Sequence, residues 1–243
     1  MGAPIFIAGP TASGKSAVAK EVAEQLQGEI ISVDSMQVYR GLDIGTAKPS
    51  ASEQAEISYH LIDCAGLKET YDAARFVREA TEAERQIDRP IFCGGTGLYF
   101  QARQEGLGES PQADAAERAA IEAMRHEEQI AELKAADPVT FECIDQQNPR
   151  RVVRALEVIR LTGKPFSGQR AEWQNTVPAN FFLIERERED LRARIEERVD
   201  AMFAAGLVDE TCSLRAALED NRVARQALGY RQVIGHLRGE QDL

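Results

Sequence analysis

Residues 9–16 read Gly-Pro-Thr-Ala-Ser-Gly-Lys-Ser, a complete G-x-x-x-x-G-K-[ST] phosphate loop. An apolar run precedes it and a helix-forming stretch, 15–26, follows, so the pattern predicts a strand, a tight turn and a helix. Backbone N–H groups in such a turn converge on a polyphosphate, and the helix dipole favours its charge. The loop is of the ATP-binding type but does not by itself specify ATP. The candidate phosphate-binding residues are Gly9, Pro10, Thr11, Ala12, Ser13, Gly14, Lys15 and Ser16.

Short apolar runs alternate with helical patterns in the first hundred residues. Strands are expected at 5–8, 29–33, 59–63 and 90–93, a helix at 71–87, and mostly loop over 36–60. This order predicts an α/β fold, a P-loop NTPase-like parallel sheet flanked by helices. Ligands bind such sheets beyond the carboxyl ends of the strands. Asp34 and Thr96 each follow a strand, so we expect them beside the phosphate loop.

The pattern changes after residue 108. Helix formers dominate, with helices expected at 115–136, 138–144 and 150–162, before a strand returns at 180–184. A long amphipathic helix then begins at Arg188 and ends near Gly206; its apolar side contains Leu191, Ile195, Val199, Met202 and Phe203. We therefore expect a discontinuous core, 1–108 and 178–243, with a helical insertion over 109–177.

Charge and cysteine usage narrow the class of protein. The net charge is −11 over 243 residues, which argues against a nucleic-acid partner, yet Arg150, Arg151 and Arg154 form a local basic cluster. The four cysteines are widely spaced, which disfavours a zinc site or a disulfide framework and fits the cytoplasm. No apolar run is long enough to span a bilayer, so we expect no membrane association.

Several separate motifs together resemble the tRNA dimethylallyltransferase (tRNA isopentenyltransferase) family, from residue 4 to about 239. The motifs are the phosphate loop, Ser32-Val33-Asp34-Ser35 with Gln37 and Tyr39, 43–49, 94–99, Arg151 with 154–157, Arg198, and Gly229-Tyr230-Arg231-Gln232. The resemblance implies transfer of a dimethylallyl group from dimethylallyl diphosphate to the exocyclic 6-amino group of adenosine 37 in tRNA, with release of pyrophosphate. The phosphate-loop pattern itself predicts Mg²⁺, which the hydroxyl of Ser16 would reach at the bound diphosphate. The resemblance further implies a monomer that binds the anticodon stem-loop.

The resemblance also implies residue roles. Asp34 is the expected general base, because an adenine amino group is a poor nucleophile until it loses a proton. Thr96 and Arg198 complete the expected catalytic set. The expected tRNA-contacting residues are Asp34, Ser35, Met36, Gln37, Thr96, Arg118, Arg150, Arg151, Val152, Val153, Arg154, Gln226, Gly229, Tyr230 and Arg231.

Each role has a structural alternative. Asp34 could instead hold a metal or water, Thr96 could cap a turn, and Arg198 could lie on a solvated helix face. Arg150 and Arg154 could lie on an exposed helix beside Glu157, and Tyr230 could belong to the core.

Two other functions also remain open at this point. A small-molecule P-loop kinase would share the phosphate loop and the parallel sheet. A tRNA-binding module without catalysis would share the basic cluster. Members of the family usually continue beyond the residues that match 229–232 with a basic helical segment. The sequence ends at Leu243 without such a pattern, so we expect that segment to be missing here.

Overall fold

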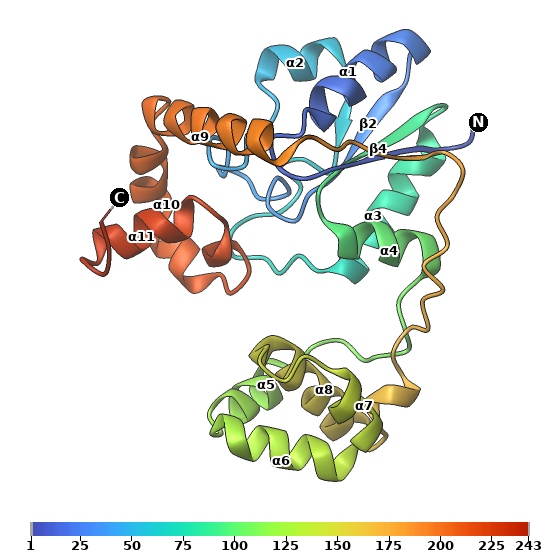
Figure 1. Ribbon diagram of the computed structural model, residues 1–243, viewed down its shortest axis with the longest axis vertical. Coiled ribbons are helices and arrows are strands. Elements are labelled where there is room, and N and C mark those ends of the chain that lie inside the picture. Colours follow the sequence, from blue (N-terminus) through green and yellow to red (C-terminus); the bar gives the residue numbers. More distant parts are fainter. Residues whose placement is uncertain (1, 243) are drawn as a thin grey trace. The chain divides into compact units, whose positions relative to one another are not determined.

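The computed structural model describes residues 2–242 and divides into two compact units, drawn in Figure 1. The first, here called the sheet unit, comprises Met1–Gln104 and Val177–Leu243. The second, the helical unit, spans Glu105–Thr176, where the sequence predicts an insertion over 109–177. None of the helices in the described part of the chain combines the length and the apolar composition that a bilayer span requires.

Five parallel strands form the sheet in the order β3-β2-β4-β1-β5, which confirms the predicted fold class. Val33 at the end of β2 lies opposite Gly94 at the end of β4, and Ala8 of β1 is the other neighbour of Gly94. The carboxyl ends of three adjacent strands therefore meet at one edge. The strands are β1 Ile5–Ala8, β2 Glu29–Val33, β3 Tyr59–His60, β4 Pro90–Gly94 and β5 Phe181–Leu183.

Alternating side chains bury both faces of this sheet, as the two-residue period of a strand requires. Ile7 and Ile91 pack with α1 (Lys15–Leu26) on one face. Phe6 and Phe92 face the other way and stack with ring centroids 5.1 Å apart. That second face is covered by α3 (Ala73–Gln86) and α4 (Gly97–Glu105). Helices on both faces hold the strand ends, and hence the loops after them, in fixed positions.

The structure differs from the predictions in the region 36–63. The strand expected over 59–63 stops at His60, because Leu61 and Asp63 adopt positive φ values of 60° and 54°. Within the expected loop lies a short helix, α2 (Ala51–Glu56). Ser50 and Glu53 form a capping box at its start, a signal that the sequence contains.

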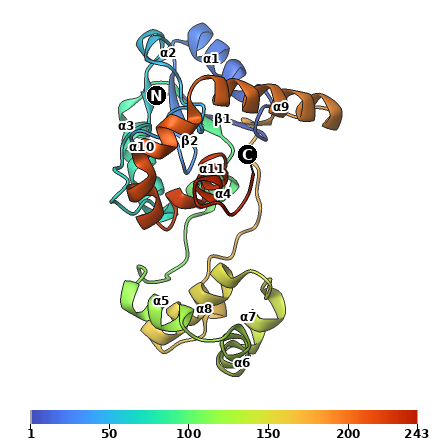
Figure 2. The same cartoon turned by 90° about the vertical axis from the view of Figure 1, so that its left-hand side faces the viewer.

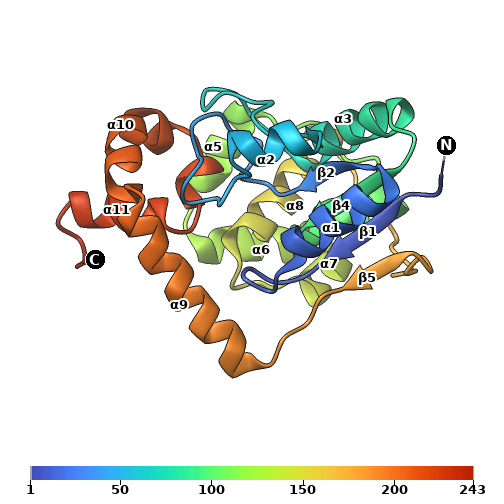
Figure 3. The same cartoon turned by 90° about the horizontal axis from the view of Figure 1, so that it is seen from above.

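Three helices follow β5. They are α9 (Arg188–Ala204), α10 (Leu207–Asp220) and α11 (Tyr230–Leu237), with a 3₁₀ turn at Ala224–Gln226. Gly206 ends α9 with a φ of +100°, as expected. Helix α9 contains no buried residue; Figure 3 shows it between β5 and α10, and Figure 2 shows it leading into α10. The apolar side predicted from its sequence is therefore largely exposed.

The helical unit packs four helices around its own small core. They are α5 (Ala115–Glu122), α6 (His126–Ala136), α7 (Pro138–Cys143) and α8 (Pro149–Thr162), followed by a 3₁₀ turn at Phe166–Gly168. The single helix predicted over 115–136 is two helices, because Glu128 accepts the backbone N–H of Arg125 and starts α6 there. Ile121, Leu133 and Leu156 are fully buried between them.

Candidate active site

The phosphate loop joins β1 to α1 in an uncommon backbone conformation. Ala12 and Gly14 have positive φ values of 64° and 93°, and the latter suits glycine. Lys15 opens α1, and its Nζ donates to the carbonyl of Pro10 at 3.2 Å. Burial lowers the pKa of Lys15; the charges of Cys93 and Asp34 partly oppose this effect. A partly buried ammonium group attracts an anion strongly, because the Coulomb interaction between two charges is larger where the effective dielectric constant is low.

Two arginines from beyond β5 hold carbonyls of the same loop. Arg186 Nε donates to the carbonyl of Ser13 at 2.7 Å, and Arg194 Nε donates to that of Ala12 at 3.0 Å. The sequence pattern did not predict that Arg186 or Arg194 would contact the phosphate loop. The available signal was the four-residue spacing of Arg194 and Arg198, which places them on one side of α9.

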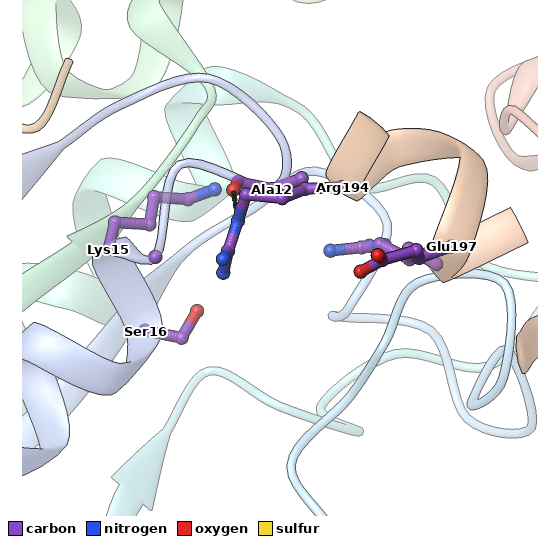
Figure 4. A pocket seen from close by; sticks show the side chains of 7 residues that line it. Ala12, Lys15, Ser16, Arg194 and Glu197 are labelled. Carbon is purple, nitrogen blue, oxygen red and sulfur yellow. Dashed lines mark hydrogen bonds between the residues drawn. The ribbon is translucent and has the colours of Figure 1, made fainter. Parts of the chain in front are cut away.

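Residues of the phosphate loop, the start of α1 and α9 line a pocket of about 410 Å³. Figure 4 shows Lys15, Ser16 and Arg194 directed toward a common space, with α9 supplying its other wall. Burial lowers the pKa of Arg198, and the charge of Asp34 opposes that shift. Arg198 is partly buried and lines the pocket, which argues against the alternative of a solvated helix face. The lining residues are Ala12, Gly14, Lys15, Ser16, Arg194, Glu197 and Arg198.

Asp34 follows the end of β2 and forms a local turn. Its Oδ1 accepts the backbone N–H groups of Met36 at 2.8 Å and Gln37 at 3.2 Å. Within residues 2–242, its other oxygen, Oδ2, accepts no hydrogen bond. The turn therefore fixes the direction of the carboxylate while one oxygen is left to accept a proton. The charge of Asp34 acts on both Lys15 and Arg198, so the three groups share one environment.

Thr96 lies on the adjacent strand end and is joined to the Asp34 turn. Its Oγ1 accepts the N–H of Ser35 at 3.1 Å, and its own N–H donates to the carbonyl of Val33 at 3.2 Å. A Cβ on Gly94 would collide with that carbonyl, so glycine is required for β4 to approach β2 this closely. The hydroxyl proton of Thr96 remains available for an acceptor on a ligand.

Among the expected tRNA contacts in the helical unit, the side chains divide into two groups. Val152 and Val153 are 0% and 6% exposed and belong to the core, so their side chains cannot reach an RNA. Arg118 and Arg154 each bind the fully buried Glu157 at 2.6 Å. For Arg154, a position beside Glu157 is the alternative that the sequence left open. Of the remaining expected residues, Arg150 and Arg151 are exposed at the start of α8.

The expected contacts near the end of the chain are also divided. Tyr230 is fully buried, its O–H donating to Glu210 and accepting from the N–H of Gly45. This corrects the expectation that the side chain of Tyr230 contacts tRNA and agrees with the alternative of a core tyrosine, because the ring is inaccessible. Arg231 is exposed, while Gln226 and Gly229 are partly so.

Comparison with known proteins identifies the family. A model described as IPP transferase matches residues 37–243. The tRNA dimethylallyltransferase of Halorhodospira halophila is 46% identical over 100% of this chain and 83% of its own. The chain belongs to the IPP transferase family. The tRNA dimethylallyltransferase 1 of Trichlorobacter lovleyi is 43% identical over 98% of this chain and 82% of its own.

Solved structures agree with this membership of the IPP transferase family. The crystal structure of the tRNA isopentenylpyrophosphate transferase of Bacillus halodurans is 36% identical, with a TM-score of 0.64, covering 99% of this chain and 78% of that one. A eukaryotic dimethylallyltransferase, captured acting on tRNA, is 26% identical with a TM-score of 0.77, covering 98% of this chain and 64% of that one.

Proposed function

We propose that this protein transfers a dimethylallyl group from dimethylallyl diphosphate to the exocyclic 6-amino group of adenosine 37 in tRNA. The observation that carries the proposal is the meeting of Asp34 and Thr96 with Lys15 at the ends of adjacent strands. This arrangement pairs a diphosphate site with a candidate base. Family membership, and the printed activities of the relatives, support this choice of donor and acceptor.

The diphosphate end of the donor binds in the pocket beside the phosphate loop. Backbone N–H groups of the loop and the ammonium of Lys15 receive its oxygens. Arg198, and the outer nitrogens of Arg194, supply further positive charge from α9. Negative charge accumulates on the diphosphate as it leaves, so these fixed cations stabilise the transition state more than the ground state.

Asp34 acts at the acceptor end. The amino nitrogen of adenosine attacks the C1 carbon of the dimethylallyl group, forming a C–N bond as the C–O bond to the diphosphate breaks. The nitrogen loses one proton to Oδ2 of Asp34, and the bonding electrons of the broken C–O bond leave with pyrophosphate. Thr96 donates its hydroxyl proton to a substrate oxygen or ring nitrogen, which orients the reactants.

The residues present fit a magnesium ion. Mg²⁺ prefers oxygen ligands and is usually bound through substrate phosphates and one or two protein groups. Ser16 presents an exposed hydroxyl in the pocket, while no cluster of three acidic, histidine or cysteine side chains exists within residues 2–242. Ser16 would therefore hold the ion together with diphosphate oxygens. Bound there, the ion would neutralise charge on the leaving group.

The tRNA is the second substrate of the proposed reaction. A base stacked in the anticodon loop has to be extruded before it can reach Asp34. We assign contacts with the anticodon stem-loop to the exposed Arg150 and Arg151 and to the accessible part of 226–231. All proposed reacting groups come from one chain, so we propose that it acts as a monomer, in the cytoplasm where tRNA is processed.

The direct test uses radiolabelled dimethylallyl diphosphate, Mg²⁺ and unmodified tRNA with adenosine at position 37. We expect label in the RNA, and none when guanosine replaces that adenosine. Consumption of ATP without label transfer would favour a kinase instead. Binding of tRNA without turnover at saturating donor would favour a binding module.

A further inference from the structure

Both ends of the Gln37 side-chain amide bond to the protein itself. Its Oε1 accepts the hydroxyl of Ser32 at 2.9 Å. Its Nε2 donates to the carbonyls of Thr46 and Ala47 at 3.2 and 3.3 Å. An amide with these partners has little capacity left for a base or a phosphate. Because the backbone N–H of Gln37 also binds Asp34 Oδ1, this side chain is directly attached to the turn that carries the carboxylate.

Residues 43–47 include the two carbonyls that accept hydrogen bonds from Gln37. Two helices far away in the sequence, α10 and α11, hold this segment. Glu210 of α10 accepts the N–H groups of Asp43 at 3.3 Å and Ile44 at 3.1 Å. Tyr230 of α11 donates to Glu210 at 2.5 Å and accepts the N–H of Gly45 at 3.0 Å. Three backbone or hydroxyl donors therefore converge on the two oxygens of one side chain, whereas an amide in its place would offer only one acceptor oxygen.

Close packing reinforces these hydrogen bonds. Tyr230 is fully buried, and a Cβ on Gly45 would collide with its ring. Directly after the segment, the side chain of Lys48 is 3% exposed and binds Asp43 and Asp63 at 2.6 Å each. These contacts restrict the 43–47 segment, so the carbonyls of Thr46 and Ala47 are fixed acceptors for the side-chain amide of Gln37.

We propose that Glu210 and Gln37 are positioning residues for the transfer reaction. Glu210 fixes the 43–47 segment, the segment fixes the side chain of Gln37, and Gln37 fixes the turn that aims Oδ2 of Asp34. This inference rests on the proposed function, because it gives Asp34 the role of base. It also reassigns Gln37, expected from the resemblance to contact tRNA, to a role inside the protein.

The test compares Gln37→Leu and Glu210→Gln with the control Glu219→Gln. Glu219 also lies on α10, but pairs with Arg215 and Arg238 at the surface. Misplacement of a reacting group by about 1 Å costs on the order of 100-fold in rate. We expect kcat to fall by about 10- to 100-fold in both test variants. The Kd for tRNA and the KM for dimethylallyl diphosphate should stay within about twofold, as general-base positioning is a transition-state effect. The control should match wild type in kcat.

A double-mutant cycle separates positioning from general damage. If Glu210 acts through Asp34, Glu210→Gln should cost nothing further in the Asp34→Ala background. Equal effects in both backgrounds would overturn the proposal, as would wild-type kcat in Glu210→Gln. A raised tRNA Kd with unchanged kcat in Gln37→Leu would restore the tRNA contact instead. Absence of transfer in the wild-type chain would refute the proposed function itself, a distinct outcome.

Discussion

The two oxygens of Asp34 have different environments, and this difference can be tested at one residue. Asn in place of Asp34 keeps an Oδ1 that accepts from Met36 and Gln37, but it cannot take a proton. We expect Asp34→Asn to lower transfer by about 10²- to 10⁴-fold, the usual contribution of a general base. Its Tm should stay near wild type, whereas Asp34→Ala should also lose stability, measured by thermal unfolding. Near wild-type turnover in the Asn variant would remove Asp34 from proton transfer.

Gly94 and Gly97 provide a matched pair within one glycine-rich run. A Cβ at position 94 would collide with the carbonyl of Val33, whereas nothing lies within 4 Å of one at position 97. Gly94→Ala should therefore destabilise the chain by about 1–3 kcal/mol, the usual cost of overpacking. Gly97→Ala should change little. Urea unfolding measures both, and equal stabilities would show that β2 and β4 separate without cost.

Residue positions at strand ends could be predicted from the sequence, but side-chain partners could not. Lys15, Asp34 and Thr96 each follow an apolar run, so parallel-sheet geometry alone brings them together. Glu210 meets Ile44 across 166 residues of chain, and no local pattern encodes that contact. For the same reason, the sequence left Tyr230 open between a tRNA contact and a core side chain, and the structure shows it buried and bonded to Glu210.

At the scale of elements, α9 shows where a periodic pattern stops being informative. The helix begins at Arg188 as predicted, yet Ile195, Val199 and Phe203 are 37%, 42% and 39% exposed. Periodicity reports which side of a helix is apolar, not whether another element covers that side. The polar residues of α9 are better constrained, because Arg194 bonds to the phosphate loop.

Glu157 links α8 to α5 and to the segment before it. It is fully buried, accepts the N–H of Asp114 at 3.0 Å, and binds both Arg118 and Arg154. Burial alone would raise the pKa of Glu157, but the two arginines outweigh it and hold that pKa below the ordinary 4.5. Its contribution to stability is therefore complete above pH 4.5 and is lost as pH falls through the lower folded pKa.

We expect Glu157→Gln to destabilise the helical unit by about 2 kcal/mol at pH 7, because both charge-assisted hydrogen bonds weaken. The difference from wild type should shrink below pH 4. Trp173, the single tryptophan, lies in this unit, so its fluorescence in urea reports unfolding there. The exposed Glu142→Gln serves as the control. A difference that persists unchanged at pH 3 would mean that Glu157 stabilises the unit by packing alone.

At the scale of the whole molecule, net charge misleads about partners. Residues 1–149 contain 13 Lys or Arg against 25 Asp or Glu, and residues 150–243 contain 16 against 15. The sign of the total thus reflects the first part of the chain. Fold class was predictable because strand and helix alternate over a hundred residues. The location of a nucleic-acid surface depends instead on which arginines remain unpaired, and only the structure distinguishes Arg150 from Arg154.

This distinction predicts opposite behaviour for neighbouring arginines on α8. Within residues 2–242, the side chains of Arg150 and Arg151 form no ion pair, whereas Arg154 is bound to Glu157. If the first two neutralise tRNA phosphates, replacing either with Ala should weaken binding to all tRNA sequences. It should also lower the slope of log K against log salt by about one.

Filter binding over a range of salt concentrations measures this slope. Arg154→Ala should instead lower stability and leave the slope near wild type, because its charge is already compensated. Arg78→Ala, on α3 of the sheet unit, controls for the loss of one exposed positive charge, because no ion pair of Arg78 is found within residues 2–242. The same slope in Arg150→Ala and Arg78→Ala would place the tRNA elsewhere on the protein. A reduced slope in the α8 variants alone would show that this acidic chain binds RNA through a local basic surface.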